Sequence, residues 1–280
     1  MNWEYEIKNR AKQIKKCQYN IKQKIFMKKI LLLLAICLST ISCKKDTIAP
    51  TNTPTVPNTP VATTDTTHVY DIDSNVYNVI QIGGQKWMKE NLKTSRYNDG
   101  TPIQYAPDNN GWHNATAGAY IYYDYDTNYN QVYGKMYNLY VINNNNVCPT
   151  GWHVPSDSEW ETLKNTLGGD SLASLKMKET GGIWVSQPTP ATNESGFSGL
   201  PGGSVGYAWN GVQDMTVFTG NQLATWWWTS TTCTAYPYSW SAPGNLARGL
   251  YSTTVPSNGY ELYKSAGTKE NGYYIRCTHD

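Results

Sequence analysis

Charged side chains are scarce in this chain of 280 residues. They make up 16% of it, against about 25% in an average globular domain. Phe is rarer still at 3 residues, although 22 Tyr and 11 Trp raise the aromatic share to 13%. Abundant rings and few charges exclude disorder for most of the chain. The shortage of Lys and Glu argues against coiled coils and helical bundles. The composition therefore predicts a loop-rich domain with short strands that works outside the cytoplasm.

An excess of positive charge is found only at the start of the chain. Residues 1–46 hold 11 Lys and Arg against 3 Asp and Glu, whereas residues 47–280 hold 12 against 18. The basic character of the protein thus belongs to its first segment. A mildly acidic domain does not neutralise phosphates, so nucleic acid is excluded as a partner.

A short apolar run follows Met27. Two lysines precede a mainly apolar stretch of 12 residues, 30–41, which is too short to cross a hydrocarbon core of about 30 Å. Ser42 and then Cys43 end the run. The segment resembles a bacterial lipoprotein signal over residues 27–42, which implies lipidation of Cys43 and a lipid-anchored protein of the outer membrane or cell surface. The alternative is an ordinary secretion signal followed by an unmodified cysteine.

The segments on either side of this signal, residues 1–26 and 43–68, have too few apolar side chains to form a hydrophobic core. Residues 1–26 are basic and separate the signal from the N-terminus. We expect them to be a mis-called extension, with Met27 as the initiator; a basic membrane-surface helix is the alternative. Residues 43–68 are rich in Thr and Pro, which favours extended polyproline geometry. They predict a tether that holds a domain away from a membrane.

Residues 69–280 alternate short apolar segments with Gly, Asn, Asp and Pro. Residues 76–82 and 85–88 flank a Gly-Gly pair, a pattern that predicts a β-hairpin. Tyrosine-rich residues 120–125 and 131–140 indicate further strands or mixed structure.

The clearest helix begins after Ser156. This residue is a natural N-cap, and Glu159 three positions later completes a capping box. Trp160, Leu163 and Leu167 fall on one helical face. The pattern predicts an amphipathic helix that packs on the core.

Seven blocks of the domain occur in an order that carries a family resemblance. The blocks are residues 71–77, 82–92, 133–138, 148–160, 196–203, 227–231 and 274–277. Together they resemble the Fibrobacter succinogenes major paralogous domain, which implies a lipoprotein or surface protein and no particular reaction. The predicted domain spans residues 69–280.

The helix block and the later Trp-Thr-Ser segment also resemble C-type-lectin-like and formylglycine-generating-enzyme-like domains. This resemblance implies an α+β fold: a C-type-lectin-like domain with small antiparallel sheets, few helices and long loops. Likeness at the level of the fold does not define an activity.

Cys148 and Cys277 both lie in blocks of the family resemblance, which favours a disulfide between them. After loss of the signal and acylation of Cys43, three cysteines remain, enough for one intramolecular disulfide. The pairing leaves Cys233 as a thiol. A bond from Cys233 to either of the other two is the alternative.

Aromatic residues gather between positions 226 and 240. Trp227 and Trp228 belong to a family block and are expected in the core. Exposed flat rings stack on the faces of sugars, so the remaining rings are candidates for glycan binding. The candidate ligand-binding residues are Trp226, Tyr236, Tyr238 and Trp240.

An Asp- and Asn-rich loop spaces its oxygen atoms like a calcium loop. Its candidate ligands are Asp124, Asp126, Asn128 and Asn130. The sixth position is Tyr129, where an EF-hand needs Gly, and the twelfth is Lys135, where it needs Glu. The EF-hand pattern therefore fails and no cofactor is expected. A looser Ca²⁺ site is the alternative to an Asx-rich turn.

These features predict a non-catalytic surface protein with a binding or surface-architecture role. The expected partners are a membrane, through the lipid anchor, and a glycan or another surface macromolecule. Asp157 and Glu159 lie in the first turn of the predicted helix, where capping explains them without catalysis. The alternative is a secreted polysaccharide-acting enzyme, which needs two carboxylates about 5–9.5 Å apart in a cleft.

Overall fold

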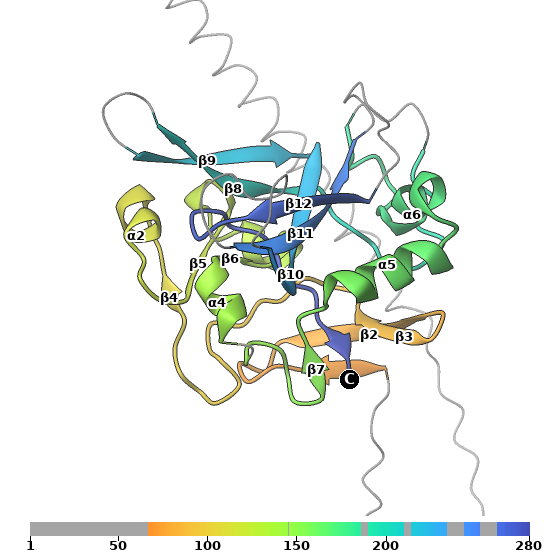
Figure 1. Ribbon diagram of the computed structural model, residues 1–280, viewed down its shortest axis with the longest axis horizontal. Coiled ribbons are helices and arrows are strands. Elements are labelled where there is room, and N and C mark those ends of the chain that lie inside the picture. The colour runs from red at the N-terminus through yellow and green to blue at the C-terminus, as the bar shows by residue number, and fades with distance from the viewer. Residues whose placement is uncertain (1–66, 145, 186–189, 210–213, 234–243, 253–261) are drawn as a thin grey trace, which may run out of the picture. The chain divides into compact units, whose positions relative to one another are not determined.

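The computed structural model describes residues 67–280 except 145, 186–189, 210–213, 234–243 and 253–261. Within these residues, short strands form three small, mostly antiparallel sheets (Figure 1). Five helices and long loops accompany them. The fold is therefore α+β with few helices, as predicted. No helix among the described residues has the length and apolar character to span a membrane.

The first sheet joins the start of the domain to its end. Its order is β1-β2-β3-β13-β7, and every pair is antiparallel. The predicted hairpin is confirmed as β2 and β3, which turn at Gly83 with a left-handed φ of 59°. The strands are β1 (His68–Tyr70), β2 (Val76–Ile82), β3 (Gln85–Met88), β13 (Thr278–His279) and β7 (Trp152–His153).

The second sheet has the order β12-β11-β10-β8-β9. Its strands pair antiparallel except β8 and β10, which are parallel where Thr225 faces Gly203. The strands are β8 (Gly202–Trp209), β9 (Asp214–Asn221), β10 (Ala224–Cys233), β11 (Gly244–Tyr251) and β12 (Tyr263–Gly267).

The third sheet and the short helices form the tyrosine-rich part of the chain. The sheet has the order β4-β5-β6. Residues 120–125 and 131–140, for which the sequence indicated strands or mixed structure, have mixed structure. Turns and short helices separate strands of two or three residues there. The elements are β4 (Gln104–Tyr105), α2 (Asn109–His113), β5 (Ala119–Ile121), the 3₁₀ turn η1 (Tyr123–Tyr125), α3 (Tyr129–Tyr133), β6 (Met136–Tyr137) and α4 (Leu139–Asn143).

The predicted amphipathic helix is α5 (Asp157–Thr166). The Ser156 hydroxyl accepts from the backbone N–H of Glu159, and the Glu159 carboxylate accepts from the backbone N–H of Ser156. Trp160 and Leu163 are fully buried, so the predicted apolar face is confirmed. The helix packs against β10 and β11 (Figure 1), and a second helix, α6 (Asp170–Met177), follows it.

Aromatic rings fill one of the two hydrophobic clusters of the core. Trp87, Trp160, Phe197 and Trp227 are all fully buried. The ring centroid of Trp160 lies 4.9 Å from that of Trp87 and 5.6 Å from that of Trp227. Phe197 meets Trp227 edge to face at 5.5 Å. Such contacts add roughly 0.5–1.5 kcal/mol per pair to the gain from burial.

Candidate functional site

Trp226 lies in β10 opposite Gly249 of β11. A Cβ at Gly249 would come within 2.7 Å of the indole ring, so the glycine leaves room for the ring to lie over its neighbour strand. The indole stacks on Tyr273 at 5.8 Å and meets Tyr251 edge to face at 5.6 Å. These contacts hold the ring in place from two sides while Trp226 remains half-buried.

A pocket of about 310 Å³ opens beside this ring, close to the lower end of the range of about 300–1,000 Å³ that is typical of ligand sites. Trp226 and Tyr251 supply its aromatic surface. Three hydroxyl side chains supply hydrogen-bonding groups, and two of them, Ser204 and Thr219, are 3.3 Å apart across β8 and β9. No charged side chain is among the lining residues, which are Ser204, Thr219, Gly220, Leu223, Ala224, Trp226, Tyr251 and Ser252.

The two tryptophans after Trp226 are core residues, as expected. Trp227 is fully buried and donates from Nε1 to Asn91 Oδ1 at 2.8 Å. Trp228 is also fully buried and donates from Nε1 to the backbone oxygen of Tyr137 at 2.7 Å. Because adjacent residues of a strand face opposite sides, both faces of β10 are covered here.

The other three candidate rings, Tyr236, Tyr238 and Trp240, lie outside the described residues. Their part in ligand binding stays a prediction. Tyr251 and Tyr273, which hold Trp226, were missed by sequence reasoning. Tyr251 reaches the ring because β11 pairs with β10, and Tyr273 reaches it from the segment before β13. Neither arrangement can be predicted from a local sequence pattern.

The carboxylates that the enzyme alternative would need are engaged in other bonds. Asp157 Oδ1 accepts from Arg248 Nε at 2.6 Å, and its Oδ2 lies 2.8 Å from Lys264 Nζ. Glu159 accepts from Ser156 and contacts His153. Ser156 and Glu159 cap the helix, whereas the Asp157 carboxylate, which was expected to serve the same end, ties α5 to β11 and β12.

A further pocket, of about 420 Å³, has one carboxylate among its lining residues, Glu179. That carboxylate accepts from the backbone N–H of Thr180 at 2.9 Å and from Asn193 Nδ2 at 3.2 Å. Burial alone would raise the pKa of Glu179, but hydrogen bonds from Ser198 and Thr180 outweigh it and lower that pKa.

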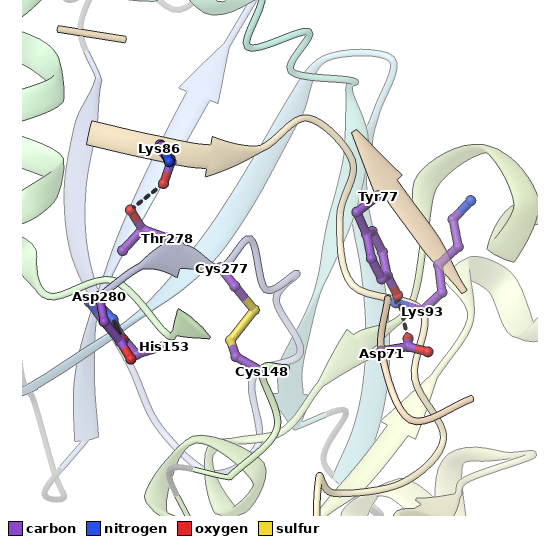
Figure 2. The surroundings of a disulfide bond; sticks show 9 residues. All are labelled: Asp71, Tyr77, Lys86, Lys93, Cys148, His153, Cys277, Thr278 and Asp280. Atoms are coloured by element: carbon purple, nitrogen blue, oxygen red, sulfur yellow. Dashed lines mark hydrogen bonds and ion pairs between the residues drawn. A yellow bond between two sulfur atoms is a disulfide. The ribbon is translucent and has the colours of Figure 1, made fainter. Parts of the chain in front are cut away.

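His153 is held between two carboxylates. Its Nδ1 lies 2.7 Å from Asp280 Oδ1, and its Nε2 lies 2.8 Å from Glu159 Oε1 (Figure 2 shows the bond to Asp280). Burial would lower the pKa of His153, but the hydrogen bonds to Asp280 and Glu159 outweigh it and raise the pKa. The side chain is 32% exposed.

The calcium-loop candidates form a compact turn. The Asp126 carboxylate accepts from the backbone N–H and from Nδ2 of Asn128, at 2.9 and 2.7 Å. Asp124 has a left-handed φ of 53° within the 3₁₀ turn, and Asn130 lies in α3. Among the described residues, no group of three or more His, Cys, Asp or Glu side chains could hold a metal ion. The hydrogen bonds fit an Asx turn, and the Ca²⁺ alternative stays a prediction.

A disulfide joins Cys148 to Cys277, as predicted (Figure 2). It links the segment before β7 to the start of β13, beside the bond between His153 and Asp280. Cys233 is buried at the end of β10 and lies outside this bond. The disulfide therefore ties the last strand of the domain to the loop that leads into α5.

These features together define a disulfide-stapled α+β domain with an aromatic pocket on its second sheet. The chain belongs to the Fibrobacter succinogenes major domain family, whose model matches residues 80–279. It is a family of surface-associated domains. Comparison with curated proteins and with solved structures found no match, and the lectin-like resemblance stays a prediction.

Proposed function

We propose that this protein is a lipid-anchored surface protein whose domain binds glycan, without catalysis, in the pocket beside Trp226. The observation that carries the proposal is the half-buried indole of Trp226, held by Tyr251 and Tyr273 over a pocket lined with hydroxyl groups. Sugars have apolar C–H faces and polar edges. A ring beside hydroxyl groups offers both kinds of contact.

The strength expected of such a site follows from ring stacking. A base stacked on an aromatic side chain is worth about 1–3 kcal/mol, and we take the same range for a sugar face by analogy. Since Trp226 is already fixed by its neighbours, little side-chain entropy is lost on binding. A single ring then supports a weak site, and repeated units of a polymer would raise the apparent affinity.

Binding is favoured over hydrolysis by the chemistry of the pocket. A glycosidase needs an acid and a second carboxylate at the scissile bond. The residues that line the Trp226 pocket include neither Asp nor Glu. Asp157 and Glu159 are engaged with Arg248 and His153.

Trp226→Ala tests this site. We expect the full chain to bind an array of oligosaccharides and the variant to bind them at least about tenfold more weakly, which corresponds to about 1.4 kcal/mol. Truncating a packed ring also lowers stability, so Thr219→Ala, at an exposed lining residue, supplies a second variant. Glutamine 81 is an exposed residue of β2 that does not line the pocket, and Gln81→Ala is the control. Unchanged affinity in both pocket variants would contradict the proposal.

The anchor is tested at Cys43. If the Cys43 thiol is acylated, the mature protein partitions into detergent and carries acyl chains, whereas Cys43→Ala remains uncleaved or unlipidated. Mass spectrometry of the N-terminal peptide measures this directly. Equal detergent partitioning of the two proteins would rule out the lipid anchor and leave the glycan site unaffected.

A further inference from the structure

We infer that the domain carries a second site for a neutral saccharide, in a pocket beside β4 and α4. The pocket has a volume of about 510 Å³ and shares no lining residue with the Trp226 pocket. Two tyrosine rings, two amide side chains and a hydroxyl surround it. Its lining residues are Tyr97, Thr101, Pro102, Gln104, Ala117, Gly118, Tyr140 and Asn144.

Tyr97 is the buried member of this set, at 6% exposure. A Cβ at Gly118 would overlap the Tyr97 hydroxyl, so only glycine lets that hydroxyl reach the backbone before β5. Burial raises the pKa of Tyr97. The Tyr97 hydroxyl is hydrogen-bonded to the Asn144 side chain, so the pocket is lined by a hydroxyl whose position is fixed.

The walls of the pocket are joined by backbone hydrogen bonds. Tyr97 N donates to Thr101 O at 2.8 Å, and Gln104 N donates to Gly118 O at 3.1 Å. These bonds hold the loop before β4 and the segment before β5 at a set separation. A site whose walls are fixed before binding loses less conformational entropy when the ligand arrives.

The rim supplies the recognition groups. Gln104 and Asn144 are exposed side chains on different elements, and Tyr140 is half-exposed on α4. Each amide offers a donor and an acceptor, which suits the neighbouring hydroxyls of a sugar ring, while Tyr140 offers an aromatic edge or face. No Lys, Arg, Asp or Glu is among the lining residues. The lining of the pocket therefore supplies no cation for the carboxylate of a uronic acid or a sialic acid.

Two separate pockets would make the domain bivalent. One chain could then hold two saccharide strands, or two points of one strand, and a second attachment strengthens binding through effective concentration. The two pockets share no lining residue, so each site can be tested independently of the other.

The test measures how many saccharide molecules one full-length chain binds. The probes are neutral gluco-, xylo- and manno-oligosaccharides, with an oligogalacturonate as the charged comparison, and calorimetry measures affinity and stoichiometry. In the Trp226→Ala background we expect neutral oligosaccharide to bind still, with fewer sites per chain. Adding Gln104→Ala and Asn144→Ala should weaken that remaining binding at least about tenfold. Asn144 is hydrogen-bonded to the buried Tyr97 hydroxyl and Gln104 Nε2 donates to Tyr105 O at 3.1 Å, so the melting temperature of each variant is measured beside its affinity. Gln81→Ala, which removes a comparable bond from an exposed amide to Gly83 O, is the control.

The outcomes separate the two sites. Complete loss of saccharide binding in Trp226→Ala alone, with the fold intact, overturns the second site and supports the first. Loss caused by the two amide substitutions in a chain with Trp226 intact supports the second site and contradicts the first. Residual binding that survives all three substitutions, a preference for oligogalacturonate, or displacement of the sugar by an extended peptide overturns the inference.

Discussion

Arg276 and Asn91, which are 185 residues apart in the chain, meet in the core through two hydrogen bonds to one oxygen atom. Arg276 Nε and Nη2 donate to Asn91 Oδ1 at 3.1 and 2.8 Å. The guanidinium carbon lies 4.1 Å from the ring centroid of Phe197 and 5.3 Å from that of Trp227. Burial lowers the pKa of Arg276 to about 9. A buried cation is here held by an amide oxygen and aromatic faces.

Asn91→Ala should therefore destabilise the fold strongly. It removes the acceptor of Arg276 Nε and Nη2 and of Trp227 Nε1, and leaves Arg276 only the backbone oxygen of Phe197 as an acceptor. A buried donor left without a partner costs about 1–3 kcal/mol, more when it is charged. We expect a loss of at least about 3 kcal/mol in urea unfolding. Asn165→Ala, at an exposed position of α5, is the control and should change stability by less than about 0.5 kcal/mol. Equal midpoints for the two variants would contradict this account of Asn91.

Removing the partners of Arg248 should show a graded effect. Arg248 is 1% exposed and contacts Asp157, which is 13% exposed, and Glu161, which is 36% exposed. Leaving a buried charge without its partner costs about 3–5 kcal/mol, so Asp157→Ala should approach that range. Glu161→Ala should cost clearly less, because water screens its side chain. Glu194→Ala, which removes a 65% exposed partner of Lys176, is the control. A larger loss for Glu161 than for Asp157 would refute this order.

The disulfide should contribute a large part of the stability. Cys148 and Cys277 are separated by 129 positions, and closing a loop of that length is worth about 4–5 kcal/mol in the chain-entropy model. The double variant Cys148→Ala/Cys277→Ala should lose stability of that order, and so should the native chain with reductant. Cys233→Ala should keep the disulfide. Peptide mapping without reductant checks the pairing, and any peptide that links Cys233 to another cysteine would refute it.

Local signals in the sequence predicted local structure well. Ser156 and Glu159 are three residues apart, so the capping box is visible in the sequence and α5 follows from it. The Gly-Gly turn between residues 82 and 85 likewise reveals its hairpin. In both cases the interacting groups are near neighbours in the chain, and a pattern of a few residues contains the whole interaction.

Contacts between distant segments could not be predicted in the same way. Asp157 was assigned to helix capping alone, because nothing around it indicates that Arg248 of β11 would face it. Trp226 was a candidate ring, but its pocket depends on hydroxyls from β8 and β9. The pocket between Tyr97 and Tyr140 was missed altogether, since its lining residues are spread over 97–104, 117–118 and 140–144, which have no shared motif.

His153 should make stability depend on pH. Its pKa is raised in the folded protein above the ordinary value of 6.5, since hydrogen bonds to Asp280 and Glu159 outweigh burial. A raised pKa gives stability that is fully present below pH 6.5 and is lost as the pH rises through the folded value. The pKa of Glu159 is lowered below 4.5, because hydrogen bonds from Ser156 and His153 outweigh burial. Its contribution is present above pH 4.5 and is lost as the pH falls through the folded value.

The two contributions overlap between about pH 4.5 and 6.5. The melting temperature should therefore decline from pH 6 to pH 9 in the native chain, and His153→Gln should decline less, because glutamine does not titrate. Asp280→Asn removes one carboxylate partner while keeping a hydrogen-bonding side chain, and it should flatten the profile in part. Calorimetry in buffers of equal ionic strength measures all three. Parallel profiles for the native chain and His153→Gln would show that the histidine between its two carboxylates does not govern the pH dependence.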